Sequence, residues 1–319
     1  MTVSSAKRTG LVTAADPAIG PGASPRPRSA NDGQRRRLVG LLRRPRYEVL
    51  PLAGTADEVE EHVPTTLPVT VTASPRKGLE PTLELTEALA GRGFSAVPHL
   101  AARLVYDERH LTEILARLDE AGVKDMFVVA GDGTPAGDFA DSLPLLTAIS
   151  RMRAAGGEDH LPLIGVAGYP EGHPLVCDDD LTAALLAKQP ASSYVVTQMC
   201  FDSVAVRRWV GQARDRGLSL PIHAGVAGAV DRLKLVRVAG RIGVGGSVRF
   251  LRKHRGGTRL LRPGGYRPDD LLEQLTSDVD RPDLALAGLH VYTLGDVAAT
   301  EQWRQGLLDR LTDGGQLDG

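Results

Sequence analysis

Short apolar runs alternate with longer amphipathic segments along most of the chain. The runs are rich in β-branched residues, and eight of them are predicted strands: 46–52, 68–73, 95–100, 124–130, 162–168, 193–199, 219–226 and 286–293. After each of the first seven comes a polar turn and a segment with helical spacing, for example 107–121, 140–154 and 202–216. Several runs are apolar on both faces, as parallel strands buried between two layers are. We therefore expect an α/β protein.

Eight strand–helix units in succession predict a (β/α)8 TIM barrel, with a doubly wound open sheet as the alternative. We place the barrel at residues 45–314 and expect 315–319 to be a flexible C-terminus. Residues 1–44 carry Ser, Ala, Pro, Gly and Arg with almost no apolar periodicity and are expected to be a disordered tail. The stretch 229–282 is too long for one helix and a turn. It is expected to hold an extra helix around 246–254 and a helix at 268–276.

The composition argues against several classes of function. A net charge of −1 gives no electrostatic reason to expect a nucleic acid or an anionic membrane as partner. The Arg35–Arg37 and Arg43–Arg44 cluster is read as a solvated linker. No apolar run approaches the ~18 residues that span a bilayer. Two cysteines, Cys177 and Cys200, are too few for a disulfide scaffold or a zinc site, and we expect no metal. The cytoplasm is the expected location, and a homo-oligomer is compatible with the sequence.

Polar residues recur where the predicted strands end. In a TIM barrel the chemistry takes place at these carboxyl ends. The residues are Glu48, Thr72, His99, Asp132, Tyr169, Gln198, His223 and Tyr292. Glu48 is the most informative, because a carboxylate inside a strand-like apolar run is costly unless it points at something. Burial would raise its pKa and make it a usable general acid near neutral pH. The alternative is an edge-strand Glu that faces water.

Two other motifs are weak. Gly243–Ser247 is Gly-rich but lacks a dinucleotide-binding register and is expected to be a loop. Asp178–Asp180 is expected to begin a helix, and Asp202 and Asp296 are expected near helix N-termini.

Seven short segments, in order, resemble motifs of the methylenetetrahydrofolate reductase family, and the resemblance runs over most of residues 46–312. The segments are Tyr47–Pro51, Val69–Thr72, Val97–Leu100, Ala130–Asp132, Gly168–Pro174, Val196–Asp202 and Leu289–Leu294. The resemblance implies a reductase of one-carbon and methionine metabolism. Glu48 falls on the catalytic acid that protonates 5,10-methylenetetrahydrofolate, so that its five-membered ring opens to an iminium and hydride yields the 5-methyl group. Asp132 and Gln198 fall on residues that hold the pterin, with Thr72 also on the substrate side. The resemblance places His99, Tyr169, His173 and Lys188 with the cofactor.

The chain departs from this family where flavin is held. Ala130 stands in place of an arginine, Asp138–Ala140 replaces a segment that carries a tyrosine, and the loop at Pro190–Tyr194 is shortened. In these respects the chain resembles a flavin-independent actinobacterial branch, in which NADH (or NADPH) passes hydride directly to the folate. The alternatives are an FAD-dependent reductase, a deazaflavin-dependent relative that reduces another methylene-pterin, and a folate-binding paralogue without activity. Arg103, Arg249 and Arg252 are candidates for NADH phosphate contacts, with solvated surface as the favoured alternative.

Overall fold

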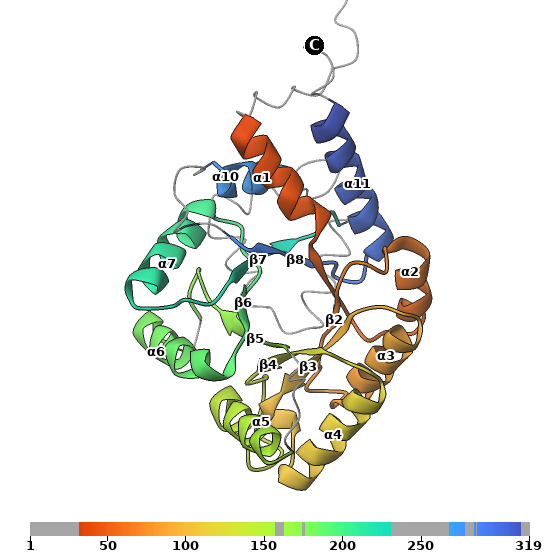
Figure 1. Cartoon of the computed structure of the whole chain (residues 1–319), viewed down its shortest axis with the longest axis vertical. Helices are drawn as coiled ribbons and strands as arrows, with labels where there is room; N and C mark the ends of the chain where they lie inside the picture. The colour runs from red at the N-terminus through yellow and green to blue at the C-terminus, as the bar shows by residue number, and fades with distance from the viewer. Residues whose placement is uncertain are drawn as a thin grey trace, which may run out of the picture. The chain divides into compact units, whose positions relative to one another are not determined.

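Eight parallel strands close into a barrel in which neighbours in the chain are neighbours in the sheet (Figure 1). The computed structural model describes residues 32–156, 163–173, 176–230, 268–277, 284 and 286–313. The strands are β1 (Arg46–Val49), β2 (Val69–Val71), β3 (Ala96–Ala101), β4 (Asp125–Val129), β5 (Leu163–Gly168), β6 (Tyr194–Thr197), β7 (Ile222–Ala227) and β8 (Gly288–Tyr292). The ring closes through β1 and β8, where Glu48 is in register with Tyr292. The TIM barrel is therefore confirmed, and the open-sheet alternative is wrong.

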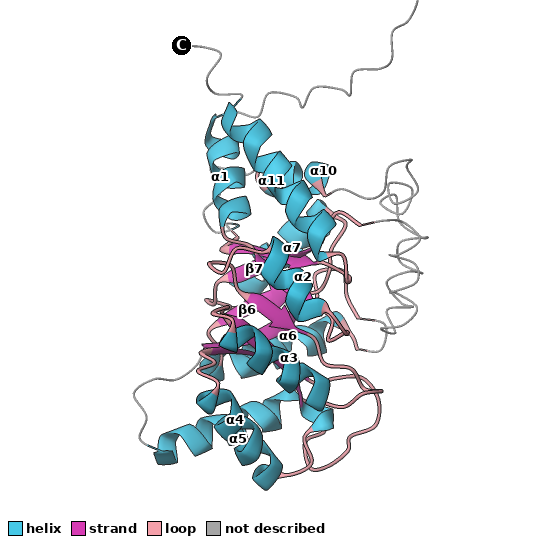
Figure 2. Cartoon of the chain, turned by 90° about the vertical axis from the view of Figure 1, so that its right-hand side faces the viewer, coloured by secondary structure: helices cyan, strands magenta, loops and turns pink. Residues whose placement is uncertain are grey.

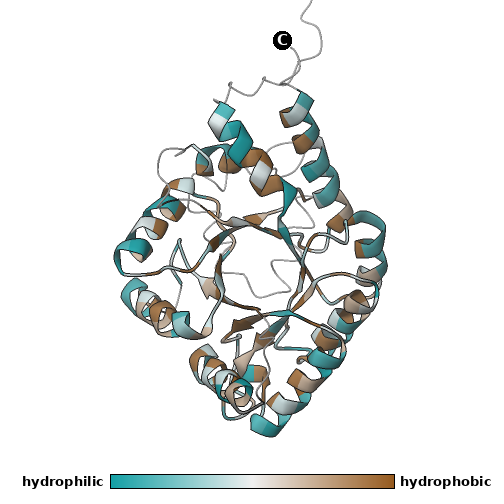
Figure 3. Cartoon of the chain, viewed as in Figure 1, coloured by the Kyte–Doolittle hydropathy of each residue, from teal (hydrophilic) through white to brown (hydrophobic). Residues whose placement is uncertain are grey.

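Helices surround the strands on the outside of the barrel (Figures 1 and 2). They are α2 (Thr55–His62), α3 (Glu80–Gly91), α4 (Glu108–Glu120), α5 (Ser142–Gly156), α6 (Asp178–Lys188), α7 (Ser203–Asp215), α10 (Asp269–Leu275) and α11 (Val297–Asp313), with short 3-10 turns η1 (Ala102–Leu104) and η2 (Gln189–Ala191). The helices are amphipathic, with hydrophilic residues over much of their outer surface (Figure 3). In α4 the buried Leu111, Ile114 and Leu118 recur with helical spacing. The side chain of Asp202 caps α7, as predicted, by accepting from the backbone N–H groups of Val204 and Ala205.

Part of the segment predicted to be a disordered tail is a helix. Residues Asp32–Arg43 form helix α1, which packs against α11. Leu38, Leu41 and Leu42 are buried in it, and their spacing is the apolar stripe of a helix. This stripe is easily missed among the arginines around it. Arg35 donates to the backbone oxygens of Leu311 and, at 3.2 Å, Thr312, near the carboxyl end of α11, where a cation is favoured. Residues 1–31, the C-terminal 315–319, the predicted loop at 243–247 and the predicted helix at 246–254 lie outside the described residues.

Alternation along the strands separates two environments. Outward-facing residues such as Tyr47, Val69 and Val166 pack with the helices in the main hydrophobic core. Inward-facing residues meet across the barrel. The Arg46 guanidinium lies 2.5 Å from Oδ2 of Asp125 and 2.8 Å from the Tyr194 hydroxyl, although β1, β4 and β6 are not neighbours. Only the interior allows such contacts, so the amino-terminal half of the barrel is closed by a buried polar network.

Gly165 makes room for this network. A Cβ atom at this position would lie 2.4 Å from the Tyr194 ring and 2.7 Å from the Phe127 ring, closer than real contacts allow. The absence of a side chain on β5 therefore lets two aromatic rings fill the interior.

The buried ion pair yields a prediction about stability. Asp125→Ala leaves the Arg46 charge buried without its partner, and we expect it to lower the free energy of unfolding by about 3–5 kcal/mol. The matched control is the double variant Arg46→Met/Asp125→Leu, which removes both charges and should cost less. Urea unfolding of the three proteins measures the difference. A double variant that is less stable than Asp125→Ala would contradict this account of the interior.

Candidate functional site

Glu48 points into the barrel and meets two histidines. Its Oε2 atom lies 3.0 Å from Nε2 of His290 on β8 and 3.5 Å from Nε2 of His99 on β3. Its side chain is 13% exposed, and its backbone oxygen accepts from both the amide and the hydroxyl group of Thr293, at 3.1 and 2.7 Å. Because β1 lies between β2 and β8 in a closed barrel, the edge-strand alternative for Glu48 is wrong.

Burial inverts the usual order of the pKa values in this cluster. It raises the pKa of Glu48 to about 7, while the nearby charge of His99, when present, acts in the opposite direction. Burial likewise lowers the pKa of His99 to about 4 and that of His290 to about 3. A carboxyl group ordinarily loses its proton before an imidazolium does. Here the carboxyl group holds its proton at a pH where both imidazoles are neutral, so Glu48 is suited to general acid catalysis near neutral pH.

Aromatic rings surround the cluster. Phe127 packs with its ring centroid 4.9 Å from that of His99 and 6.4 Å from that of His290. Tyr292 meets His290 edge to face at 5.0 Å, and its hydroxyl donates to the backbone oxygen of Thr197 at 3.0 Å. These contacts hold the two imidazoles in place and keep water from them.

The residues expected to bind substrate lie at the carboxyl end of the barrel, just after strands β2, β4 and β6. Thr72 follows β2, and its N–H donates to the Val49 oxygen at the end of β1, at 3.1 Å. Gln198 follows β6, and its N–H donates to the Gly168 oxygen at the end of β5, at 2.8 Å. Asp132 follows β4 and is exposed. Since parallel strands share one carboxyl end, these side chains rim the opening above Glu48.

The predicted cofactor residues fall in three places. His99 lies on β3, with its Nε2 atom 3.5 Å from Oε2 of Glu48. Tyr169 lies directly after β5, and its ring meets that of His173 edge to face at 5.4 Å. Burial, and secondarily the charge of Asp132, raises the pKa of Tyr169. Tyr169 and Asp132 therefore lie near each other at the rim. Lys188 ends α6, outside the ring of strands. Burial lowers its pKa, and the charge of Asp141 opposes this effect.

His223 is not at the strand end where the sequence analysis placed it. β7 begins at Ile222, so His223 is at its amino-terminal side. Its ring meets that of Tyr194 at 5.5 Å, and burial together with the charge of Arg46 lowers its pKa to about 3. The histidine therefore belongs to the buried interior network. The predicted strand began at residue 219, whereas β7 begins at Ile222. His223 was therefore expected nearer the carboxyl end of the strand than it is.

Arg103 stabilises a loop. Its guanidinium donates to the backbone oxygens of Ala140, Gly133 and Gly131, at 2.9, 3.1 and 3.3 Å. These residues belong to the segment between β4 and α5 that carries Asp132. The other two arginines considered for phosphate contacts, Arg249 and Arg252, lie outside the described residues.

Two residues of the site were not singled out from the sequence. Glu171 accepts at Oε1 from the backbone N–H groups of Phe201 and Asp202, at 2.8 and 2.9 Å, and so ties together the loops that follow β5 and β6. His290 contacts Glu48 directly. Both lie in segments that carried the family resemblance, and a polar residue inside an apolar strand was the signal available for His290.

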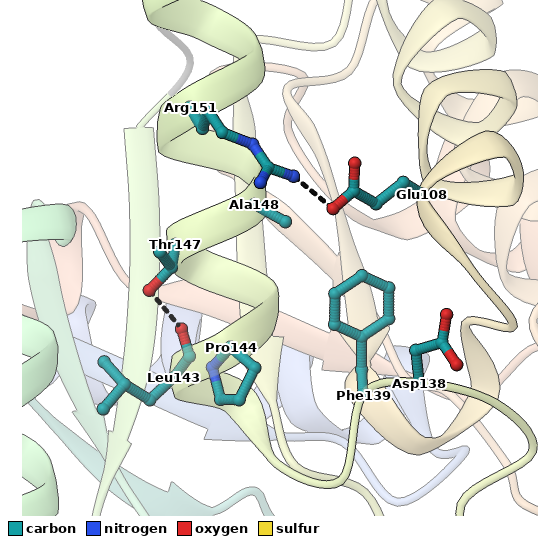
Figure 4. A pocket seen from close by; sticks show the side chains of 8 residues that line it. All are labelled: Glu108, Asp138, Phe139, Leu143, Pro144, Thr147, Ala148 and Arg151. Carbon is teal, nitrogen blue, oxygen red and sulfur yellow. Dashed lines mark hydrogen bonds and ion pairs between the residues drawn. The ribbon is translucent and has the colours of Figure 1, made fainter.

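A separate cavity of about 440 Å³ opens between α4, α5 and the segment before α5 (Figure 4). Glu108 and Arg151 form an ion pair across it, and Phe139 forms part of its wall. Phe139 is 5% exposed and belongs to the hydrophobic core. The cavity contains none of the predicted site residues, and we assign it no role. In the described ranges, no group of three or more His, Cys, Asp or Glu side chains could hold a metal ion. Nor is any described helix long and apolar enough to cross a bilayer.

The raised pKa of Glu48 predicts a pH-dependent stability. The folded protein favours the neutral carboxyl group. Below the ordinary pKa of 4.5 the group is neutral in both the folded and the unfolded protein, so it does not affect stability. Between pH 4.5 and about 7 the unfolded protein loses this proton more readily than the folded one, so the free energy of unfolding falls as the pH rises. Glu48→Gln removes this dependence on pH. We therefore expect the free energy of unfolding of Glu48→Gln, relative to that of the wild type, to be higher at pH 8 than at pH 5, by up to about 3 kcal/mol.

Urea unfolding at the two pH values measures this gain. Glu84→Gln, an exposed position on α3, is the control and should show little pH-dependent difference from the wild type. An equal effect of Glu48→Gln at both pH values would show that the folded protein does not favour the neutral carboxyl.

Comparison with known proteins identifies a family. Residues 46–242, which include β1 through β7, match the family model described as methylenetetrahydrofolate reductase. The chain is 29% identical over 119 residues to "Methylenetetrahydrofolate reductase 1" of Schizosaccharomyces pombe (strain 972 / ATCC 24843), and the aligned part covers 35% of this chain and 19% of that protein.

Solved structures are more distant. An oxaloacetate acetylhydrolase in complex with oxalate has a TM-score of 0.49 at 9% identity, covering 89% of this chain and 88% of that chain. A dihydropteroate synthase from Thermus thermophilus has a TM-score of 0.44 at 14% identity, covering 87% and 95% of the two chains. These scores support no inference about activity. The family model covers well over half of the chain, which thus belongs to the methylenetetrahydrofolate reductase family.

Proposed function

We propose that the protein reduces 5,10-methylenetetrahydrofolate to 5-methyltetrahydrofolate with hydride taken directly from NADH or NADPH, without flavin. The observation that carries the proposal is the buried Glu48 carboxyl, which remains protonated near neutral pH at the mouth of the barrel. Family membership supports the substrate and the reaction type. We place this reaction in the cytoplasm, where it supplies methyl groups for methionine synthesis.

The reaction needs one proton and one hydride. The methylene carbon of the substrate bridges N5 and N10. Glu48 gives its proton to N10, the bond from the carbon to N10 breaks with its electron pair moving to N10, and an N5 iminium results. Hydride from C4 of the nicotinamide then reduces the iminium carbon to a methyl group, and the dinucleotide is released in its oxidised form. The acid must be neutral before the reaction, which the burial of Glu48 provides.

Residues at the rim would hold the two reactants. A pterin presents an amino group and a ring N–H beside acceptors, which a carboxylate and an amide can recognise with directional hydrogen bonds. Asp132 and Gln198, after β4 and β6, supply this pair. Thr72, after β2, lies next to the end of β1, the strand that carries Glu48. His99, Tyr169 and His173 would face the nicotinamide, and Lys188 would lie toward the rest of the dinucleotide. Direct transfer requires the donor and acceptor carbons within about 3–3.5 Å in a dry pocket.

Flavin is poorly accommodated by the residues present. Ala130 offers no charge where relatives have an arginine. The neighbouring Arg103 donates from Nε and Nη1 to three backbone oxygens. Phe139, in the segment that carries a tyrosine in relatives, is in the hydrophobic core. These observations favour the flavin-independent reaction over the FAD-dependent one, and we derive no step through flavin.

The absorbance spectrum of the purified protein tests the choice of hydride donor. We expect a colourless protein that oxidises NADH or NADPH when methylenetetrahydrofolate is added and forms one 5-methyltetrahydrofolate per dinucleotide. A yellow protein whose activity depends on bound flavin would support the FAD-dependent alternative. Activity with a reduced deazaflavin alone would support the deazaflavin relative, and folate binding without turnover would support the inactive paralogue.

Replacement of the acid tests the role of Glu48. Glu48→Gln keeps the size and hydrogen bonding of the side chain but removes its acidic proton. We expect turnover to fall by roughly two to four powers of ten, with folate binding retained. Steady-state kinetics and folate titration of the variant, beside the exposed control Glu84→Gln, provide the measurement. Wild-type turnover in Glu48→Gln would overturn the assignment.

A further inference from the structure

His290 is a buried titratable group in contact with Glu48 to which the proposed reaction gives no role. Its side chain is 1% exposed, and its Nε2 atom lies 3.0 Å from Oε2 of Glu48. Its other ring nitrogen, Nδ1, is buried and has no hydrogen-bond partner among the residues that the structure describes. The two nitrogens therefore have very different surroundings, and this difference determines which of them carries the hydrogen.

The charged form of the imidazole is excluded near neutral pH. Burial, and then the charge of Arg46, lowers the pKa of His290 to about 3. The charged and titratable groups near this ring from the packed strands are Arg46 and Glu48 on β1, His99 on β3, His223 on β7 and Tyr292 on β8. None of them supplies a negative charge other than Glu48 itself, which is the group that His290 contacts.

Of the two neutral tautomers, one fits the surroundings better. A hydrogen on Nδ1 would be a buried donor without an acceptor, which is costly. A hydrogen on Nε2 is donated to Glu48 and leaves only an unpaired acceptor at Nδ1. The Nε2–H bond also suits both states of the acid, because Oε2 can accept it before and after the proton is delivered. A hydrogen on Nδ1 would require Glu48 to aim its own proton at Nε2, away from the substrate.

Both imidazole contacts fall on the same oxygen of Glu48. His99 approaches Oε2 at 3.5 Å, and His290 approaches it at 3.0 Å. The Oε1 atom receives neither contact. A proton on Oε2 would compete with the donated N–H for the same space, whereas a proton on Oε1 meets no such conflict.

We propose that His290 is a positioning residue, which donates its Nε2–H to Oε2 of Glu48 and thereby places the acidic proton on Oε1. This inference rests on the proposed role of Glu48 as the acid, but it is independent of whether the hydride comes from a nicotinamide or a flavin. His290 itself does not exchange a proton with the substrate.

Two substitutions separate the donated hydrogen bond from the packing of the ring. His290→Leu removes the donor, and His290→Gln retains an N–H group near the position of Nε2. A donor bond to the carboxylate favours its charged form, so its loss raises the pKa of Glu48. In His290→Leu we expect the midpoint of the alkaline limb of kcat/KM to move up by about one pH unit and the plateau to fall about tenfold. His290→Gln should keep the wild-type midpoint and recover most of the rate.

The matched control is His223→Leu, which removes another buried neutral imidazole from the barrel interior and should leave the midpoint where it is. A ¹³C NMR titration of the Glu48 carboxyl, assigned by its disappearance in Glu48→Gln, follows the same shift without turnover. It therefore tests His290 even if the folate reaction is not observed, so the two failures can be told apart. An unchanged Glu48 midpoint in folded His290→Leu, or a His290→Gln variant as impaired as His290→Leu, would overturn the proposal.

Discussion

The burial of the Glu48 carboxyl against two neutral imidazoles is the constraint on which the rest of the site depends. A carboxylate in this place would cost several kcal/mol, so the group holds its proton to a pH of about 7. Glu48 would lose its proton at a lower pH if a cation paired with its carboxylate. Arg46 is two residues away on the same inward face of β1, and it is withheld from Glu48 by Asp125 and Tyr194. The deeper ion pair thus leaves Glu48 without a cationic partner, and the charge of Arg46 also disfavours a charge on His290.

The barrel provides this arrangement through alternation along one short strand. Arg46 and Glu48 point inward, while Tyr47 between them points outward and donates to Glu301 of α11 at 2.6 Å. Glu301 is held in turn by Arg304, which also donates to the Leu42 oxygen at 2.9 Å. The strand is therefore fixed from both faces. A shift of one residue would exchange the two environments and place a tyrosine in the site.

Part of this arrangement follows from the sequence, since the alternating apolar runs predict the barrel and a carboxylate inside such a run makes Glu48 a candidate for the site. The remainder depends on contacts between distant strands. His290 was hidden because its partner is separated by 242 residues in the chain. His223 was placed at the wrong end because an apolar run does not mark where the strand itself begins. The arginines of α1 obscured its stripe of buried leucines. Arg103 is of a residue type that suits phosphate, but it contacts backbone oxygens. Charge and hydropathy do not reveal such partners, which only the closed barrel brings together.

The location of one proton tests this account most directly. Neutron diffraction from perdeuterated crystals, grown at a pH somewhat below the Glu48 pKa of about 7, would show hydrogen positions in the cluster. The account predicts a deuteron on the Glu48 carboxyl and a single deuteron on each of the imidazole rings of His99 and His290. A bare carboxylate beside a doubly deuterated His99 or His290 would contradict it.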